Sequence, residues 1–188
     1  MTKIRLARSI QTDSVVDGEG IRTVIWTQGC VHLCPGCHNP NTHSFKSGIL
    51  LEVDRLIKQL ENLEHHNGVT LSGGDPLCQS EAILKLVKYL KLKEINIWCY
   101  TGYTYEQLQL LSKVEPKLWE ALTYIDVIVD GRFLLEKRSL DLKYRGSSNQ
   151  RIIDVQESLK KGEIVLISKY QNAKEIKNIY QKEEAIYI

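Results

Sequence analysis

Apolar runs and amphipathic segments alternate along this chain, and the alternation predicts strands that take turns with helices. Short runs rich in β-branched and aromatic residues predict strands at residues 22–27, 69–71, 94–100, 125–129 and 151–155. Apolar residues at helical spacing, with charged residues on the opposite side, predict helices at residues 53–63, 82–90, 104–111 and 116–122. Thr104 and Gln107 have the spacing of a capping box, and Pro116 suits the first turn of a helix.

Strands that alternate with helices favour a parallel sheet with right-handed crossovers. The 188 residues offer too few such units for a complete eight-fold barrel, which typically needs about 250 residues. We therefore expect an α/β fold, with an open, partial β/α barrel of about six strands preferred over a doubly wound sheet. Residues 1–168 are expected to form one domain, and residues 169–188 a helical extension packed on it.

Composition and charge narrow the class of protein. The chain carries 25 Lys and Arg residues against 23 Asp and Glu, and the resulting charge of +2 indicates neither a nucleic-acid nor a membrane-surface partner. Apolar runs fall short of the roughly 20 residues of a membrane span, and the charged N-terminal segment does not resemble a secretory signal. We therefore expect a cytoplasmic protein, in which cysteines indicate metal binding or catalysis instead of a disulfide framework.

Three of the five cysteines lie close together, directly after the first predicted strand. Cys30, Cys34 and Cys37 form a C-x3-C-x2-C pattern in a loop that Gly and Pro residues keep irregular. Thiolates select zinc, copper(I) or iron–sulfur clusters. A structural zinc site needs a fourth ligand, and the candidates, none at the usual paired spacing, are His32, His38, His43, Cys78 and Cys99. The pattern favours a cluster with one iron open to a non-protein ligand, and zinc or packed free thiols remain as alternatives.

A glycine-rich segment, SGGDP, follows the second predicted strand. Gly73 and Gly74 lack side chains, so the backbone can approach a ligand closely, and Asp75 supplies negative charge for an ammonium group. An ordinary strand-to-helix turn explains the same residues equally well. Cys78 and Cys99 are expected to be structural.

The cysteine pattern resembles the signature of the radical S-adenosylmethionine enzymes. Gly36 stands where many members carry an aromatic residue, and the resulting CPGC is similar to the small activating proteins of anaerobic ribonucleotide reductase. The similarity to these activating proteins runs through GCVHLCPGCHN, LSGGDPL, YTGY, DVIVDGRF and RGSSNQRIIDV, from about residue 15 to residue 168.

The resemblance implies two cofactors. One [4Fe–4S] cluster per chain would be held by Cys30, Cys34 and Cys37, and S-adenosylmethionine would bind its fourth iron through amino and carboxylate groups. The residues implicated in binding S-adenosylmethionine are Gly36, Cys37, His38, Gly73, Gly74, Asp75, Asp130 and Arg132. For Asp130 and Arg132, the sequence agrees equally well with a solvated strand end that binds no ligand.

The resemblance also implies a reaction and its partners. A reduced cluster would cleave S-adenosylmethionine, and the resulting radical would take a hydrogen atom from a glycine of the large anaerobic reductase. A low-potential donor such as flavodoxin or ferredoxin would supply the electron, and no catalytic acid or base is required. Residues 17–22 and 37–40 are also similar to activators of pyruvate formate-lyase-type enzymes, so that class of partner is an alternative.

Overall fold

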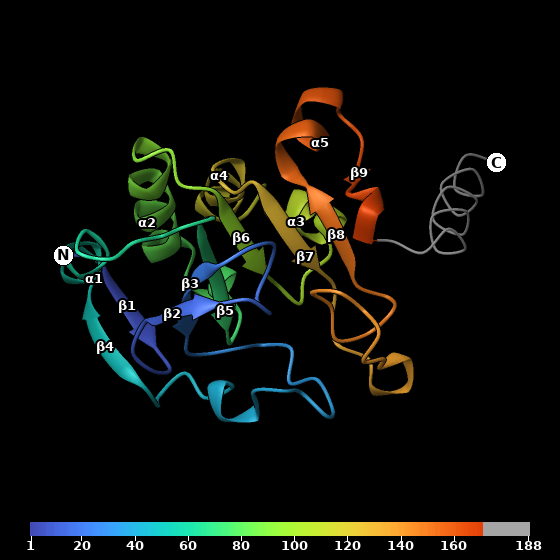
Figure 1. Cartoon of the computed structure of the whole chain (residues 1–188), viewed down its shortest axis with the longest axis horizontal. Helices are drawn as coiled ribbons and strands as arrows, with labels where there is room; N and C mark the ends of the chain where they lie inside the picture. The colour runs from blue at the N-terminus through green and yellow to red at the C-terminus, as the bar shows by residue number, and fades with distance from the viewer. Residues whose placement is uncertain (171–188) are drawn as a thin grey trace.

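Four neighbouring strands of one sheet run parallel and bring together the loops predicted to carry the chemistry. A computed structural model describes residues 1–170 of the chain (Figure 1). Its strands are β1 (Lys3–Leu6), β2 (Gln11–Ser14), β3 (Arg22–Thr27), β4 (Ile49–Glu52), β5 (Val69–Gly73), β6 (Ile97–Tyr100), β7 (Val127–Asp130), β8 (Arg151–Asp154) and β9 (Val165–Leu166). Its α-helices are α1 (Val53–Leu60), α2 (Ser80–Leu92), α3 (Tyr105–Leu111), α4 (Pro116–Thr123) and α5 (Val155–Lys161).

The strand order is β4-β1-β3-β5-β6-β7-β8-β9, with β2 paired to β3 outside this path. β3, β5, β6 and β7 are parallel neighbours, whereas the remaining pairs are antiparallel. The register sets Thr27 beside Gly73 and Tyr100 beside Val129. The carboxyl ends of the four parallel strands therefore meet at one edge of the sheet, where α/β proteins place their ligands.

The α/β class is confirmed, and the strand predicted at residues 22–27 has those bounds in the structure. The expectation of a parallel strand at residues 151–155 is wrong, because β8 pairs antiparallel with β7 and no α-helix lies between them. Residues 1–170 form nine strands instead of about six. Sequence reasoning missed β1, β2, β4 and β9, which are two to four residues long and take their conformation from neighbouring strands.

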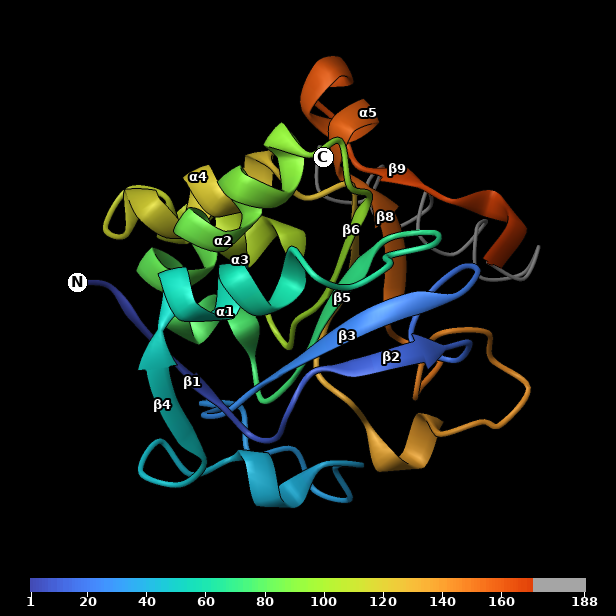
Figure 2. The same ribbon diagram turned by 60° about the vertical axis from the view of Figure 1, so that its left-hand side comes forward.

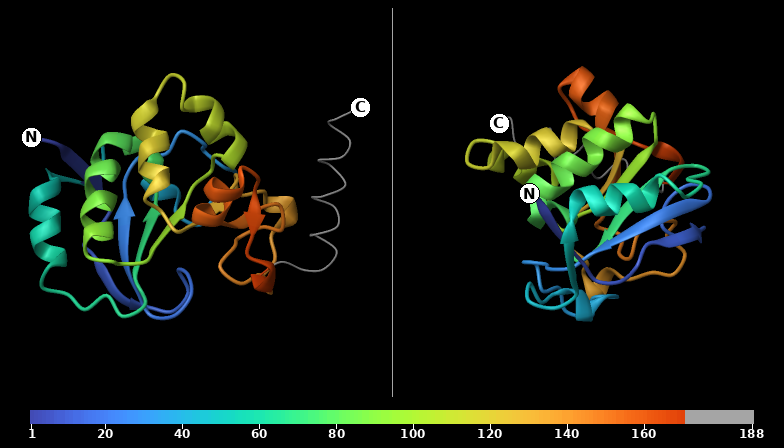
Figure 3. Two further views of the ribbon diagram at one scale, coloured as in Figure 1. Left: turned by 90° about the horizontal axis from the view of Figure 1, so that it is seen from above. Right: turned by 90° about the vertical axis from the view of Figure 1, so that its left-hand side faces the viewer.

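The helices form a layer on one face of the sheet. α2 packs against α1 and α4, and α4 packs against α3 and α5. Figure 2 and the right-hand view of Figure 3 show the helices above the sheet and the loop between β3 and β4 below it. Ile97, Cys99 and Ile128 belong to the main apolar cluster, together with helix residues such as Leu86 and Leu122. The prediction that Cys99 is a packing residue is confirmed by its complete burial.

Alternate residues of the same strands face the other side of the sheet. There Trp98, Val127, Val129 and Ile152 form a second, smaller apolar cluster. The Tyr144 ring, from the segment after β7, contacts Trp98 edge-on at 5.5 Å between centroids. Among residues 1–170, this face is therefore covered by a chain segment instead of helices.

The predicted capping box of α3 is confirmed, since Thr104 Oγ1 accepts from the Gln107 amide and Gln107 Oε1 accepts from the Thr104 amide. Within residues 1–170, every helix is too short or too polar to cross a membrane. The extension predicted at residues 169–188 lies almost entirely outside the described residues.

Candidate functional site

A cavity of about 480 Å³ opens at the carboxyl ends of the parallel strands. Its walls come mainly from residues 15–17, 30–39, 72–75, 100–102 and 131–150. In Figures 1 and 2 the light-blue loop after β3 and the orange loop after β7 lie on the same, lower side of the molecule. The expected convergence of the cysteine loop and the glycine-rich segment on one edge is confirmed.

The cysteine loop presents all three candidate ligands to this cavity. Cys30, Cys34 and Cys37 each line it and are partly exposed. The Cys30 amide donates to the His43 carbonyl and the Cys37 amide to the Cys34 carbonyl, both at 3.1 Å. These backbone bonds hold an irregular loop in one shape, with all three cysteines on the cavity wall.

The donor set fits a cluster better than a single metal ion. Among residues 1–170, no three His, Cys, Asp or Glu side chains converge closely enough to hold one ion. A cubane distributes its thiolate ligands over separate iron atoms, and three thiols around one cavity match that requirement. Burial raises the pKa of Cys30 because a desolvated thiolate is costly, and a positively charged iron centre offsets that cost.

The glycine-rich turn packs directly against the base of the cysteine loop. The Gly74 amide donates to the Thr27 carbonyl (2.8 Å), and the Asp75 amide donates to the Gly29 carbonyl (2.9 Å). A Cβ on Gly74 would lie 2.3 Å from the Gly29 carbonyl oxygen, and one on Gly73 would lie 2.4 Å from the Thr27 carbonyl oxygen. The glycines therefore permit a close approach between two backbone segments of the chain itself, which sequence reasoning had attributed to a ligand.

Asp75 is buried, with 1% of its surface exposed, and its carboxylate is fully engaged. Oδ2 accepts from His32 Nε2 (2.8 Å), Thr101 Oγ1 (2.9 Å) and the Gly102 amide (2.9 Å). Oδ1 accepts from the Leu77 amide (3.0 Å). These contacts favour a structural role, and contact between Asp75 and an ammonium group stays a prediction.

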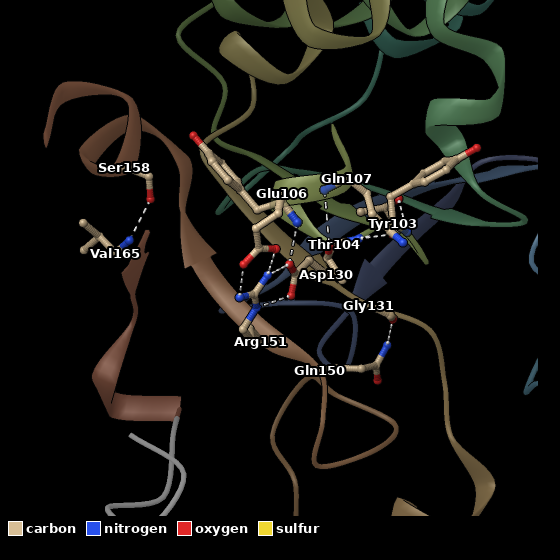
Figure 4. Close-up of polar contacts among 12 residues, drawn as sticks. Tyr103, Thr104, Glu106, Gln107, Asp130, Gly131, Gln150, Arg151, Ser158 and Val165 are labelled. Atoms are coloured by element: carbon tan, nitrogen blue, oxygen red, sulfur yellow. Dashed lines mark hydrogen bonds and ion pairs between the residues drawn. The ribbon is translucent and has the colours of Figure 1, made fainter. Parts of the chain in front are cut away.

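Asp130 is likewise buried and belongs to an ion-pair network (Figure 4). Arg151 donates to both oxygens of Asp130, and the Tyr105 amide donates to Oδ2 at 2.8 Å. Arg151 also binds both oxygens of Glu106, at 2.9 and 2.8 Å. Burial raises the pKa of Asp130. Burial also acts to raise the pKa of Glu106, but its hydrogen bonds to Arg151 outweigh burial and lower that pKa to about 2.

Asp130, Arg132 and Gly36 do not line the cavity wall. The Arg132 guanidinium donates to the backbone carbonyl of His32. A Cβ on Gly36 would lie 2.9 Å from Leu135 Cδ1, so Gly36 packs against the segment after β7. His38 does line the cavity, as predicted, and its ring lies 4.9 Å from that of Phe133. Direct ligand contacts of Asp130, Arg132 and Gly36 therefore stay predictions.

Comparison with known proteins places this site in a family. A family model described as a 4Fe-4S single cluster domain matches residues 16–153. Curated anaerobic ribonucleoside-triphosphate reductase-activating proteins of Vibrio cholerae and Haemophilus influenzae are 39% and 36% identical over 146 residues, which is 73% of this chain and 90% of each relative. The protein of that name from Enterobacteria phage T4 is 37% identical over 145 residues, 73% of this chain and 86% of its own. The chain belongs to this family of activating proteins.

Membership of the family confirms the resemblance drawn from the sequence motifs. It also supports an iron–sulfur cluster in this chain, in agreement with the three thiols around the cavity. The matched residues 16–153 include every strand from β3 to β7 and every residue that lines the cavity except Val15.

The RGSSNQ segment of this activating-protein chain, residues 145–150, forms the last part of the loop between β7 and β8. Gln150 Oε1 accepts from the amides of Gly146 (2.8 Å) and Ser147 (3.2 Å), and its Nε2 donates to the Gly131 carbonyl (3.0 Å). Ser147 is completely buried, and its Oγ accepts from the Leu134 amide at 3.2 Å. The segment therefore stabilises the loop after β7, drawn in orange in Figure 1, through hydrogen bonds within that loop.

Sequence reasoning missed several residues of the site. The additional side chains on the cavity wall include Val15, Val16, Asp17, Phe133 and Tyr144. None has a spacing or charge pattern that would single it out, because each reaches the cavity from an irregular loop. The sequence also provided no indication of the hydrogen bond between His32 and Asp75.

Proposed function

We propose that this chain is a glycyl-radical activating enzyme that acts on the anaerobic ribonucleoside-triphosphate reductase. The observation that supports it best is the arrangement of Cys30, Cys34 and Cys37 around one cavity in a chain of this family. These cysteines would hold one [4Fe–4S] cluster, leaving its fourth iron to S-adenosylmethionine.

When bound, the reduced cluster and S-adenosylmethionine supply one-electron cleavage of a carbon–sulfur bond and a radical that takes hydrogen from a glycine of the reductase. The chain's own residues would bind the cluster and S-adenosylmethionine and orient them relative to each other. Cys37, His38, Gly73 and Gly74 all line the cavity, and the ligand would lie against them. No side chain is assigned as a catalytic acid or base, and the cavity walls serve to exclude water.

The remaining features of the proposal concern shape and partners. We propose that the sheet is an open, partial barrel, whose unclosed side admits the glycine-bearing loop of the reductase. Val15 and Val16, 63% and 71% exposed, would border that entrance. The electron would come from a flavodoxin or ferredoxin, and we expect a cytoplasmic protein without nucleic-acid or membrane partners. One domain over residues 1–168 with a helical extension over 169–188 remains part of the proposal.

Metal analysis of anaerobically purified protein tests the cofactor. About four iron and four sulfide per chain are expected, the stoichiometry of a cubane. Cys34→Ala should lose the cluster, whereas Cys99→Ala, at a packing position, should keep it. One zinc without sulfide would support a structural zinc module instead.

Product analysis tests the reaction and the partner. Reduced protein should form 5′-deoxyadenosine and methionine from S-adenosylmethionine. Incubation with the anaerobic reductase should give a glycyl radical signal in electron paramagnetic resonance. A signal only with a pyruvate formate-lyase-type enzyme would support the alternative partner, which the similarity of residues 17–22 keeps as a second candidate.

A further inference from the structure

His32 lies in the cysteine loop, between Cys30 and Cys34, and joins this loop to the ends of the three other parallel strands. Its Nε2 lies 2.8 Å from Asp75 Oδ2, and its side chain is only 9% exposed. Because an ionised carboxylate can only accept, the imidazole donates in this bond. The backbone carbonyl of His32 accepts from Arg132, which follows β7.

Asp75 holds this imidazole in a fixed place. The same Oδ2 also accepts from Thr101 Oγ1 and from the Gly102 amide, both at 2.9 Å, in the segment after β6. Oδ1 is occupied by the Leu77 amide. A carboxylate held by four donors cannot rotate without losing several of them, so the position of His32 is determined by β5 and β6.

Neighbouring residues pack closely around the imidazole ring of His32. A Cβ on Gly102 would lie 2.3 Å from His32 Cδ2, so a larger residue there would displace the imidazole. The Tyr103 ring contacts the imidazole edge-on, with centroids 4.5 Å apart. Contacts to the imidazole of His32 thus come from residues that follow β5 and β6, and the residue after β7, Arg132, binds its backbone carbonyl.

We propose that His32 is a positioning residue, whose hydrogen bond to Asp75 fixes the cysteine loop relative to the Gly73-Gly74 turn. The loop and the turn both line the cavity, so this bond sets the relative position of two parts of the wall around the space in which S-adenosylmethionine would lie. The inference rests on the proposed function. It assigns to His32 an effect on ligand affinity that a simple packing residue would not have.

The test compares three variants of the cluster-loaded, anaerobic protein. His32→Leu removes the donor, His32→Gln replaces it with an amide whose Nε2 reaches a similar position, and Gly102→Ala pushes the imidazole aside. Removal of the hydrogen bond between His32 and Asp75 should weaken S-adenosylmethionine binding about tenfold or more, because a hydrogen bond to a charged group typically contributes at least that factor. His32→Gln should bind within about threefold of wild type.

Affinity is measured by equilibrium dialysis, alongside iron content and the change that S-adenosylmethionine causes in the paramagnetic resonance spectrum of the reduced cluster. His43→Leu is the matched control, since His43 lies in the same loop and its Nε2 has no hydrogen-bond partner among the described residues. This control should keep wild-type affinity and spectrum.

Each outcome decides the matter. Weak binding by His32→Leu and Gly102→Ala, with His32→Gln near wild type, supports the proposal. Wild-type affinity in His32→Leu, or equal weakness in His32→Gln, overturns it. If His32→Leu fails to retain iron, Gly102→Ala and His32→Gln decide by the same criteria. If wild type holds a cluster but binds no S-adenosylmethionine, the proposed function fails and this inference falls with it.

Discussion

The carbonyl oxygen of Gly29 lies so close to Gly74 that a Cβ on Gly74 would be 2.3 Å from this oxygen. Gly29 immediately precedes the first cysteine, and Gly74 belongs to the turn after β5. The two residues therefore determine how near the cysteine loop lies to the glycine-rich turn.

Replacement of Gly74 by Ala should force these segments apart. We expect the free energy of unfolding to fall by roughly 1–3 kcal/mol, as for other overpacked positions, and iron content to fall with it. Urea unfolding and iron analysis of the anaerobic protein measure both. Gly162→Ala is the control, because nothing lies within 4 Å of its Cβ and only its φ of 72° is unfavourable. Equal iron content in the two variants would contradict the prediction.

Replacement of Arg151 by Met should leave Asp130 buried without its partner. The expected loss in the free energy of unfolding is about 3–5 kcal/mol, the cost of breaking one side of a buried pair. Lys85→Met, at an exposed pair with Asp54, should lose at most about 1 kcal/mol. Chemical denaturation of both variants at neutral pH compares them. Similar losses would show that the Asp130–Arg151 pair contributes no more than a surface pair.

Replacement of Gln150 by Leu should loosen the loop after β7. The amides of Gly146 and Ser147 lose their acceptor, and the Gly131 carbonyl loses its donor. Hydrogen exchange at residues 146–147 should quicken by about fivefold or more, since each bond contributes about 1 kcal/mol. Gln109→Leu, on the exposed side of α3, should leave that exchange unchanged. Unaltered exchange in Gln150→Leu would show that the loop is held by other contacts.

Alkylation of cysteines should separate cluster ligands from packing residues. Burial raises the pKa of Cys78 to about 12. Below this pKa the thiolate fraction rises tenfold with each pH unit, so at about pH 8 only ~1 in 10,000 Cys78 thiols is ionised and reactive. Iodoacetamide labelling read by mass spectrometry should leave the cluster-loaded protein unmodified at its cysteines.

Removal of the cluster by a chelator should then expose the ligand cysteines to labelling while Cys78 and Cys99 stay unmodified. Labelling should reach Cys78 only as the pH approaches 12 or after unfolding. Rapid labelling of Cys78 in folded protein at about pH 8 would contradict its raised pKa.

The sequence predicts best where a local rule decides the structure. Arg22–Thr27 is a β-branched, aromatic run in the middle of the sheet, and its bounds agree with the prediction. Thr104 and Gln107 form their capping box from residues three apart. The cysteine spacing alone indicated the metal chemistry of the loop.

The sequence does not reveal partners that lie far along the chain. Asp75 binds His32, 43 residues earlier, and Asp130 binds Arg151, 21 residues later. No local pattern reveals such a partner. β8 was placed in a parallel unit because strand–helix alternation carries no information on the direction in which the chain returns from residues 131–150.

The walls of the cavity come from segments as distant as residues 15–17 and 142–150. Contacts between distant segments require costly loop closure and form late in folding. A nascent chain that ends before residue 131 would carry all three cysteines but not the wall that faces them. The cluster can therefore reach its final surroundings only after residues 131–150 have been synthesised and have packed beside the cysteine loop.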